Sequence, residues 1–552
     1  MHKIYLTLAL ILLTFQAHAQ QTVGLFLNDS LAFNGYTLLN PNSARQAYLL
    51  DNCGLIVNQW SSDNISYFSA YLTPEGNLLR TVRFGALGGG VEMHNWEGEL
   101  IWQYPFFSDK HSQHHDLELL PNGNILLLAW ESYTREAVIA AGRDSMLVNE
   151  ELRPEAIFEI EPIGTDSANI VWEWHVMDHL IQDHDTTKEN YGNPAEHPEL
   201  VDINYIGIGG GTEDWLHANY IDYNPDLDQI IINLRNFNEF WVIDHSTATQ
   251  EAAGHTGGNS GKGGDILYRW GNPETYRRGT SENRVFYRQH NAHWIPAGYP
   301  GEGHIMVFNN GLEREPIPFS SIDVLIPPVD AIGNYETPAA LPFAPSELHS
   351  SYTATPPADM YSARISSAQR LPNGHTLICH GQAGRLFEVD ADGILYWDYI
   401  NPLHGNNPVE QGNPAQGNSV FAAVRYTPDF EGFVGKDLTP GEPIELNPFP
   451  SNCEITVNTE TPNFAIFDLI AAPNPATNDV YFSYNLNGKT SNANLELYNS
   501  QGQFLWKKYL PQGSREINVN VGDLPSGVYF YRIASPENVS RVRKLILAKP
   551  NK

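Results

Sequence analysis

The stretch Arg288–Trp294, RQHNAHW, places an arginine and two histidines where a β-strand is expected. Neutral imidazole can act as a base or a nucleophile near pH 7, and imidazolium can stabilise an anion. Comparable polar groups occur in three other predicted strand regions, namely His114-His115-Asp116, Asp214-Trp215-Leu216-His217-Ala218-Asn219, and Arg235 after the run Ile230–Leu234. These residue types indicate acid–base or nucleophilic chemistry if the fold brings them together.

Arg235 follows an apolar run that should be buried. Burying a guanidinium without an anionic partner costs on the order of several kcal/mol. Two interpretations stay open, an internal ion pair with one of the many Asp and Glu residues or the binding of a ligand anion. The planar guanidinium suits carboxylates, phosphates and sulfates.

A metal centre is the main rival interpretation of the histidines, because His-rich clusters with a nearby Asp can bind zinc. Arg235 argues against it, since it would add positive charge beside a cation. The chain also lacks HExxH and CxxC spacings. We therefore expect no metal at this site and no cofactor.

Recurring phrases predict the elements that position these residues. Apolar stretches flank a Pro-x-Gly turn in YLTPEGNLL, LLPNGNILL and RLPNGHTLI, and each pattern predicts a β-hairpin. A second phrase combines Asp or Asn, then Gly, with a strand that carries a tryptophan, as at Trp60, Trp102 and Trp397. Two hairpins per unit make a four-stranded sheet, and repeated sheets of this kind are blades of a β-propeller.

The predicted fold is therefore all-β, a six-bladed β-propeller with a small C-terminal β-sandwich. The six units lie near 33–60, 69–105, 114–177, 215–272, 290–350 and 364–402. We expect the segment from Val420 to Val457 to close the ring. The innermost strands of a propeller line one central channel, so the polar groups of different units should converge there.

The two ends of the chain differ from its middle. A lysine, an apolar run and the pattern Ala17-His18-Ala19 predict a secretory signal peptide over residues 1–19. We assign the propeller to 20–457, a linker to 458–463 and the C-terminal β-sandwich to 464–552. From Phe464 onward ten Lys and Arg accompany six Asp and Glu, against 22 and 58 before it, which supports this boundary.

Charge and cysteine content narrow the partners and the covalent framework. The net charge of -32 argues against nucleic acid or an anionic membrane as partner. No stretch after the signal peptide approaches the ~20 apolar residues of a membrane span. Three cysteines allow at most one disulfide, and Cys53 with Cys453 is favoured because Cys379 lies in an apolar strand pattern.

The region from about 33 to 440 resembles the bacterial arylsulfotransferases, six-bladed propeller enzymes that move sulfate between phenols without a nucleotide sulfate donor. The matching pieces are HHDLELLPNGNILLL, DWLHANYIDYNPDLDQIIINLRN, RQHNAHW followed by MVFNNG, and SAQRLPNGHTLICHGQAGRLFEV. The combination of DWxHxN, a strand ending in arginine, and QHxA before FxNG carries the resemblance. It implies a phenolic sulfate donor and a phenol acceptor as substrates.

The resemblance also implies roles for individual residues. His290 in QHxA would be the covalent nucleophile that forms a sulfohistidine, and the two half-reactions would give ping-pong kinetics. Arg235 and His217 would bind the sulfuryl oxygens, while His115, or His114 in the alternative register, would act as acid and base. The neighbours expected to support them are His114, Asn219 and His293.

The C-terminal phrases APNPATNDVYFSY, ELYNSQGQ, LPSGVYFYRI and RKLILAK resemble the sorting domain of the Por (type IX) secretion system of Bacteroidetes. That resemblance implies export by the outer-membrane secretion machinery, followed by release or surface attachment. Two functions stay open, a secreted aryl-sulfate sulfotransferase-like enzyme and a non-catalytic propeller for binding or adhesion at the cell surface. The presence of Arg235 together with all three histidines favours the enzyme.

Overall fold

The structure is a computed structural model that describes residues 21–85, 88–207, 213–337, 339–449, 453, 469–484, 493–499, 504–511, 515–534 and 543–549. Strands account for 45% of the residues and helices for 6%, which confirms the all-β class. The predicted signal peptide and linker lie outside the described residues. Within the described ranges, no helix is long and apolar enough to cross a membrane.

Six antiparallel sheets of at least four strands follow one another between Gly24 and Tyr426 in the described residues. From the inner to the outer edge they are β31 (Val420–Tyr426), β2 (Tyr36–Pro41), β3 (Gln46–Leu50), β4 (Ile56–Ser61); β5 (Ile65–Leu72), β6 (Leu78–Phe84), β7 (Gly88–His94), β8 (Leu100–Pro105); β9 (His111–Leu119), β10 (Ile125–Glu131), β13 (Glu155–Ile163), β14 (Ser167–His175); β17 (Ala218–Asn224), β18 (Gln229–Leu234), β19 (Glu239–Asp244), β20 (Tyr268–Trp270); β21 (His290–Trp294), β22 (Ile305–Asn309), β23 (Ser321–Leu325), β24 (Ser350–Tyr352); and β25 (Ser367–Arg370), β26 (Thr376–His380), β27 (Arg385–Val389), β28 (Leu395–Ile400) with β1 (Gly24–Asn28) added outside.

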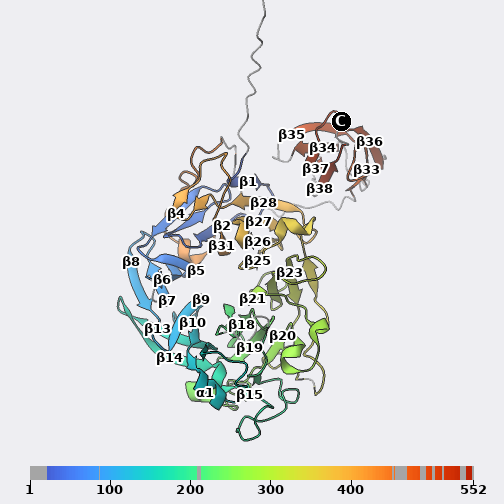
Figure 1. Cartoon of the computed structure of the whole chain (residues 1–552). Coiled ribbons are helices and arrows are strands. Elements are labelled where there is room, and N and C mark those ends of the chain that lie inside the picture. Colours follow the sequence, from blue (N-terminus) through green and yellow to red (C-terminus); the bar gives the residue numbers. More distant parts are fainter. Residues whose placement is uncertain are drawn as a thin grey trace, which may run out of the picture.

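The six sheets surround a common centre, with β5, β9, β21, β25 and β31 nearest to it (Figure 1). The innermost strands contact one another in a closed sequence, through the pairs β31 and β5, β5 and β9, β9 and β17, β17 and β21, β21 and β25, and β25 and β31. Strand β31 comes from the end of this region, yet it pairs with β2 from its beginning. The two ends of the region are thus joined within one sheet.

The predicted Pro-x-Gly hairpins are confirmed. The turns connect β5 to β6, β9 to β10 and β25 to β26, and their glycines Gly76, Gly123 and Gly374 have φ values of 81°, 87° and 88°. In the second turn, the N–H of Leu120 donates to the Asn124 carbonyl (2.9 Å). A residue with a side chain would be strained at these φ values, which explains the fixed place of the glycine.

Five tryptophans near the outer edges of the sheets, three of them from the second phrase, link neighbouring sheets. Each indole N–H donates to a backbone carbonyl beside the outermost strand of the next sheet, in the pairs Trp60 to Asn95 (2.8 Å), Trp102 to Ser167 (2.9 Å), Trp174 to Gly264 (2.7 Å), Trp270 to Pro345 (2.8 Å) and Trp397 to Asn52 (2.8 Å). All five indoles are buried. Burying each indole therefore stabilises the apolar contact between sheets while its N–H keeps a partner.

Smaller elements complete the region. They are the strand pairs β11 (Tyr133–Thr134) with β12 (Glu151–Leu152), β15 (Leu180–Ile181) with β16 (Val201–Asp202), and β29 (Leu403–His404) with β30 (Asn407–Pro408); the helices α1 (Arg135–Ala140) and α2 (Thr249–Ala252); and the 3-10 turns η1 (Val176–Asp178), η2 (Pro273–Tyr276), η3 (Ser281–Asn283), η4 (Pro357–Met360), η5 (Gly381–Ala383) and η6 (Glu431–Phe433).

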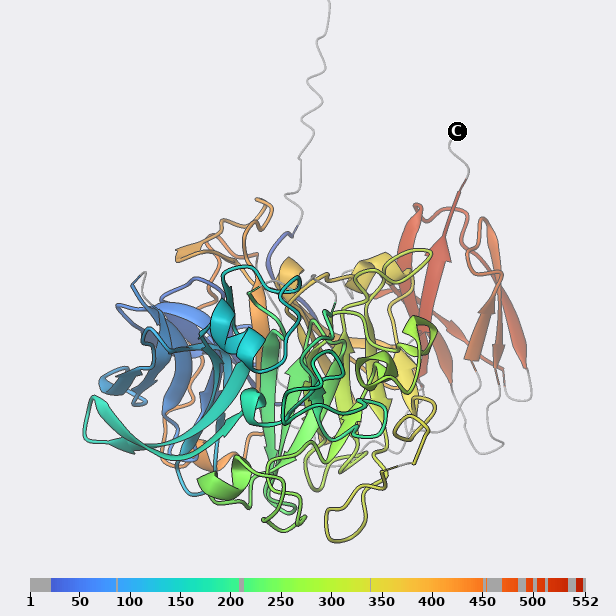
Figure 2. The same ribbon diagram turned by 60° about the horizontal axis from the view of Figure 1, so that its bottom comes forward.

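The C-terminal residues form two further sheets that share one hydrophobic core. Their strands are β32 (Leu469–Ala472), β33 (Asp479–Tyr484), β36 (Glu516–Asn520) in one sheet, and β35 (Phe504–Tyr509), β34 (Asn494–Asn499), β37 (Gly527–Ala534), β38 (Arg543–Leu547) in the other. Buried and exposed residues alternate along β33, as expected for a sheet with one face in the core. These strands form a group of their own in the second view (Figure 2).

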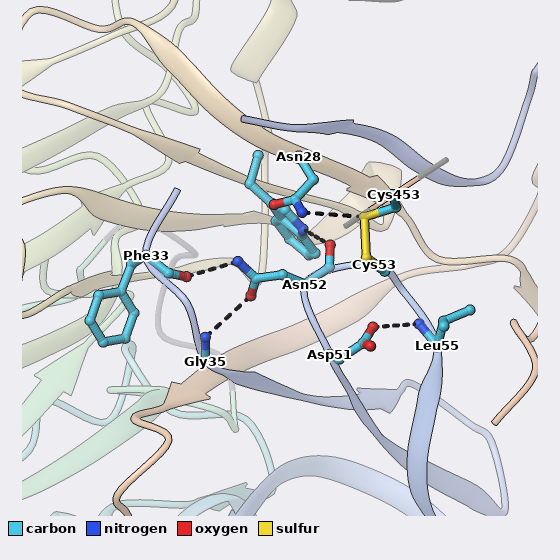
Figure 3. The surroundings of a disulfide bond; sticks show 9 residues. Asn28, Phe33, Gly35, Asp51, Asn52, Cys53, Leu55 and Cys453 are labelled. Atoms are coloured by element: carbon cyan, nitrogen blue, oxygen red, sulfur yellow. Dashed lines mark hydrogen bonds between the residues drawn. A yellow bond between two sulfur atoms is a disulfide. The ribbon is translucent and has the colours of Figure 1, made fainter. Parts of the chain in front are cut away.

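A disulfide joins Cys53 to Cys453, with 5.7 Å between the Cα atoms, so the favoured pairing is confirmed (Figure 3). Cys53 lies in the turn between β3 and β4, and Asn28 from β1 donates to the sulfur of Cys453 (3.3 Å). Cys379 is a free, buried thiol, and burial raises its pKa to about 12. The bond therefore ties the first sheet to a residue 400 positions later in the chain.

Removing this disulfide should lower thermal stability. Closing a long loop restricts the unfolded chain and typically contributes ~2–4 kcal/mol, so a Cys53→Ser, Cys453→Ser double variant should melt a few degrees lower. Differential scanning calorimetry measures the change. Reductant should lower the Tm of the wild type to that of the variant and leave the variant unmoved, whereas equal melting temperatures without reductant would contradict the expectation.

Candidate functional site

The site residues stand at irregularities of three innermost strands. The regular pairing of β9 with β10 is interrupted between Gln113 and Leu117, that of β17 with β18 between Ala218 and Tyr220, and that of β21 with β22 between His290 and His293. Four non-glycine residues here have positive φ values, namely His115 (52°), His217 (55°), Arg288 (60°) and Asn291 (57°). Such bulges and strained residues redirect side chains and are common beside functional sites.

The three predicted catalytic histidines gather in one neighbourhood. The ring centroids of His115 and His217 are 4.7 Å apart. The Phe421 ring lies 6.1 Å from His115 and 6.2 Å from His290, and Phe68 stacks on His115 at 4.7 Å with an interplanar angle of 9°. The histidines of β9, β17 and β21 therefore meet beside two phenylalanines that the sequence did not single out.

A hydrogen-bonded chain orients His115. Nε2 of His114 lies 2.8 Å from Oε2 of Glu155, and Nδ1 of His114 lies 2.8 Å from Nδ1 of His115. Because the carboxylate accepts, His114 carries its proton on Nε2, and its Nδ1 accepts from Nδ1–H of His115. Trp130 stacks on His114 at 4.0 Å, which fixes the ring. His115 is left with its lone pair on Nε2.

The pKa of His115 is shifted well below its usual value. Burial is the main cause, and the charges of His217, His114, His290 and Arg235 lower it further. The imidazole is therefore neutral near pH 7. In this state it can act as a general base, whereas it must first be protonated to act as a general acid. His114 lies between Glu155 and His115 in this chain of hydrogen bonds and orients the His115 ring.

His290 is buried and held as one tautomer. Its Nδ1 donates to Oδ1 of Asn310 (2.7 Å), whose amide orientation is set by donation to the carbonyls of Ser362 and Ile365 (2.8 Å each). Nε2 accepts from the N–H of Ile365 (3.1 Å). Burial and the charge of Arg235 lower the pKa of His290 to about 3. The ring is neutral at physiological pH, and its lone pair lies on Nε2.

His217 and Arg235 are joined through the backbone. The N–H of Arg235, directly after β18, donates to the His217 carbonyl (3.1 Å), and Nδ1 of His217 pairs with Oδ2 of Asp214. Burial raises the pKa of Asp214, but its hydrogen bond to His217 and nearby positive charges outweigh burial and lower it overall. With Nδ1 engaged by a carboxylate, His217 can present Nε2 to a substrate.

Two guanidiniums share one neutral acceptor. Nη1 of Arg235 (3.2 Å) and Nη1 of Arg288 (2.6 Å) both donate to Oδ1 of Asn236, and Arg288 also reaches Glu313 at 3.3 Å. Burial and the Arg288 charge lower the pKa of Arg235 to about 10. Among the described residues no carboxylate lies within ion-pair distance of Arg235, although the charges of Asp214 and Glu313 partly offset the fall of its pKa.

Asn219 and His293 have different surroundings. Nδ2 of Asn219 donates to the Gln289 carbonyl (3.0 Å) and so links β17 to the residue before His290. Nδ1 of His293 donates to the Asn291 carbonyl (2.9 Å), and burial lowers the pKa of His293 to about 4. Asn219 supports the site through the backbone, whereas no interaction of His293 with the other site residues is seen among the described ones.

Asp116, beside His115, is a buried acid with a raised pKa. Burial raises it to about 7, although Ser69, the N–H of Ile221 (3.2 Å) and the hydroxyl of Tyr71 (2.9 Å) favour the ionised form. The folded state therefore keeps this carboxyl protonated between about pH 4 and 7, where the unfolded chain ionises it. The resulting stability is fully present below about pH 4 and is lost as pH rises through 7.

An Asp116→Asn variant should flatten the pH dependence of stability. In urea unfolding, the free energy of unfolding of the wild type should fall between pH 5 and 8 by a few kcal/mol more than that of the variant. Buried histidines with lowered pKa values change the free energy of unfolding with pH in the opposite direction. They are present in both proteins, so their contribution cancels when the two free energies are compared. An exposed carboxyl, Asp226, provides the control, since Asp226→Asn should keep the wild-type slope. Parallel slopes for Asp116→Asn would mean that the carboxyl is ionised in the folded protein.

Comparison with known families gives two matches. A family model described as "Arylsulfotransferase (ASST)" matches residues 15–318, and a secretion system C-terminal sorting domain matches residues 470–548. The sorting domain implies the secretion machinery as a partner and export to the cell surface or the extracellular space. No curated protein matches the chain.

Several solved structures are distantly similar. A protein of unknown function from Bacteroides caccae is 12% identical and has a TM-score of 0.38, covering 71% of this chain and 100% of its own. A catalytically inactive virginiamycin B lyase from Staphylococcus aureus, solved with quinupristin, is 10% identical with a TM-score of 0.32, and the match covers 69% of this chain and 89% of the lyase. The β-propeller domain of Cps50 (Swd1) from Myceliophteria thermophila is 11% identical with a TM-score of 0.30, and the match covers 62% of this chain and 90% of that domain.

Proposed function

Because this chain belongs to the arylsulfotransferase (ASST) family, we propose that it is a secreted aryl-sulfate sulfotransferase. It would move a sulfuryl group from a phenolic sulfate ester to a phenol through a sulfohistidine at His290. The observation that carries the proposal is a buried His290, held by Asn310 with its lone pair on Nε2, whose pKa is lowered by the charge of Arg235, a guanidinium without a carboxylate at ion-pair distance in the described residues. The six sheets would be the blades of one propeller, and the C-terminal sheets a β-sandwich used for sorting.

In the first half-reaction, Nε2 of His290 attacks sulfur, the S–N bond forms and the bond from sulfur to the phenolic oxygen breaks. Asn310 accepts Nδ1–H, so it stabilises the positive charge that develops on the ring. Arg235 and His217 bind the sulfuryl oxygens as charge shifts among them. The bound sulfate ester would raise the pKa of His115, since an anion favours imidazolium, and let it protonate the departing phenolate.

In the second half-reaction, the acceptor phenol gives its proton to Nε2 of His115 and its oxygen attacks sulfur. The S–N bond breaks, and the new sulfate ester leaves with His290 restored. The chain from Glu155 through His114 keeps the lone pair of His115 directed outward for this step. Phe68 and Phe421 would give the aryl ring an apolar surface next to the base.

The Ile365 N–H must release Nε2 of His290 before attack, because a neutral ring nitrogen has one lone pair. Ile365 and the next residue, Ser366, have φ values of 53° and 91°, so this segment is held in an unusual conformation. Once sulfur occupies Nε2, the same N–H would lie beside a sulfuryl oxygen. It would then serve as a further donor to the transferred group.

The proposal is tested by incubating the protein with 4-nitrophenyl sulfate and a phenol. Release of 4-nitrophenol that depends on the acceptor, together with formation of the sulfated acceptor, is expected. Release that needs only water would indicate a sulfatase. Binding of the ester without turnover would favour the non-catalytic propeller.

A further inference from the structure

Three side chains able to bind a metal meet at the outer edges of two neighbouring sheets, remote from the innermost strands that carry the histidine site. His179 follows β14, His255 lies in the glycine-rich loop after α2, and Asp265 precedes β20. Their ligand atoms all lie within 4.8 Å of one another. We propose that His179, His255 and Asp265 bind a divalent transition metal ion of the zinc class.

The two imidazoles converge on a single carboxylate oxygen. Nδ1 of His179 lies 2.9 Å and Nδ1 of His255 2.7 Å from Oδ1 of Asp265. Nε2 of His179 lies 2.9 Å from the Ala252 carbonyl, which can only accept, so the ring proton is on Nε2. In the neutral ring, the Nδ1 lone pair then faces another acceptor. A proton, on the ring or on the carboxyl, or a cation bound by both groups must therefore offset this contact.

The surroundings of His179 are those of a preoriented ligand. Metal-binding histidines usually donate their other N–H to a carbonyl or carboxylate, as His179 does to Ala252. Trp174 stacks on the ring at 5.5 Å and 10°, while its indole N–H donates to the Gly264 carbonyl. A Cβ at Gly264 would come within 2.7 Å of Nε2 of His179, so only glycine leaves room for the ring here.

Burial and donor type indicate the class of ion. His179 is fully buried, whereas the His255 side chain is 59% exposed, so an ion could enter from solvent and keep water as a further ligand. Two imidazole nitrogens with one carboxylate suit zinc and its neighbours, while calcium and magnesium prefer oxygen ligands. The ion would link the loop after α2 to the segment after β14. The indole of Trp174 connects the same two parts of the chain through its hydrogen bond to Gly264. This role does not depend on sulfuryl transfer.

Titration of the EDTA-treated full chain tests the proposal. Isothermal titration with Zn²⁺ should give one site per chain and raise the Tm, and Co²⁺ should give the visible absorption of a low-coordinate nitrogen and oxygen site. Ca²⁺ and Mg²⁺ should do neither. His255→Ala should weaken Zn²⁺ binding at least tenfold. His197→Ala, which removes another half-exposed imidazole paired with a carboxylate (Glu199, 3.0 Å), should bind like the wild type.

His255 is largely exposed, so its variant should fold, and equal melting temperatures of the wild type and His255→Ala in EDTA verify this. The proposal is overturned if Zn²⁺ does not bind stoichiometrically or if His255→Ala binds it as tightly as the wild type. The triad would then be an imidazolium–aspartate pair with a neighbouring histidine. The sulfuryl transfer assay would be unaffected by that result.

Discussion

A His290→Ala variant is expected to lose acceptor-dependent release of 4-nitrophenol by ~10⁴-fold or more, the scale seen when a covalent nucleophile is removed. The reason is structural. His290 supplies an unprotonated Nε2, because burial and the Arg235 charge lower its pKa to about 3, and Asn310 fixes the proton on Nδ1. Alanine removes that nitrogen. If water attacked sulfur instead, the ester would be hydrolysed and the acceptor phenol would not be sulfated. Steady-state rates at several acceptor concentrations measure the loss.

The covalent intermediate gives a second readout. Wild-type protein mixed with donor alone should gain the mass of one SO₃ on the peptide that contains His290, and added phenol should remove it. The matched control is His293→Ala on the same strand, whose ring contacts the Asn291 carbonyl and should leave rate and labelling within a few-fold of the wild type. Transfer that persists in His290→Ala would assign the nucleophile to another residue.

The low pKa of His290 also sets the acid limit of the reaction. A free imidazole titrates near 6.5, but this ring becomes protonated only near pH 3. Activity should therefore not fall along a titration of His290 between pH 7 and 5. The same depressed value makes the unfolded state bind more protons in that range, so this residue favours unfolding progressively as pH falls below 6.5.

Local patterns predicted what depends on local chemistry. The glycines of the hairpin turns and the tryptophans of the outer strands could be recognised because each has one physical task at a fixed spacing, a positive φ at Gly123 or an indole bond at Trp60. The four predicted catalytic residues could also be named, because an arginine or histidine in a buried strand needs an explanation. To predict that these four residues lie near one another, it was enough to assume that the sheets form a ring whose innermost strands line one centre.

The hydrogen bonds of those residues could not be predicted. Asp214 and Asn310 stand in the motifs that carry the resemblance, but the spacing does not say that they hold the rings of His217 and His290. Glu155 lies in none of these motifs, and nothing in its spacing relates it to His114. The interrupted pairing that turns His115 toward the centre has no signature in hydrophobic periodicity, since a bulge shifts the alternation rather than marking it. Arg235 shows the same limit, because the sequence left an internal ion pair and a ligand anion open and did not point to the shared amide oxygen of Asn236.

A His115→Ala variant is expected to slow transfer by ~10²–10⁴-fold, the usual contribution of a general acid–base residue. The size of the effect should depend on the leaving group. Phenolate is a strong base with a pKa of ~10 for its conjugate acid, so it needs the proton from His115, whereas the nitro group makes 4-nitrophenolate a better leaving group. The variant should therefore lose more activity with phenyl sulfate than with 4-nitrophenyl sulfate as donor.

This dependence separates proton transfer from mere packing. If His115 only filled space between Phe68 and His217, its removal would slow both donors equally. A Glu155→Gln variant tests the chain behind it, because Glu155 accepts from His114 and from the Ala218 N–H (2.7 Å) at once, and an amide cannot accept with both atoms. It should show the same preference for the better leaving group as His115→Ala, to a smaller degree, since it disturbs the orientation of the base rather than removing it. Equal losses with both donors in both variants would leave His115 without a role in proton transfer.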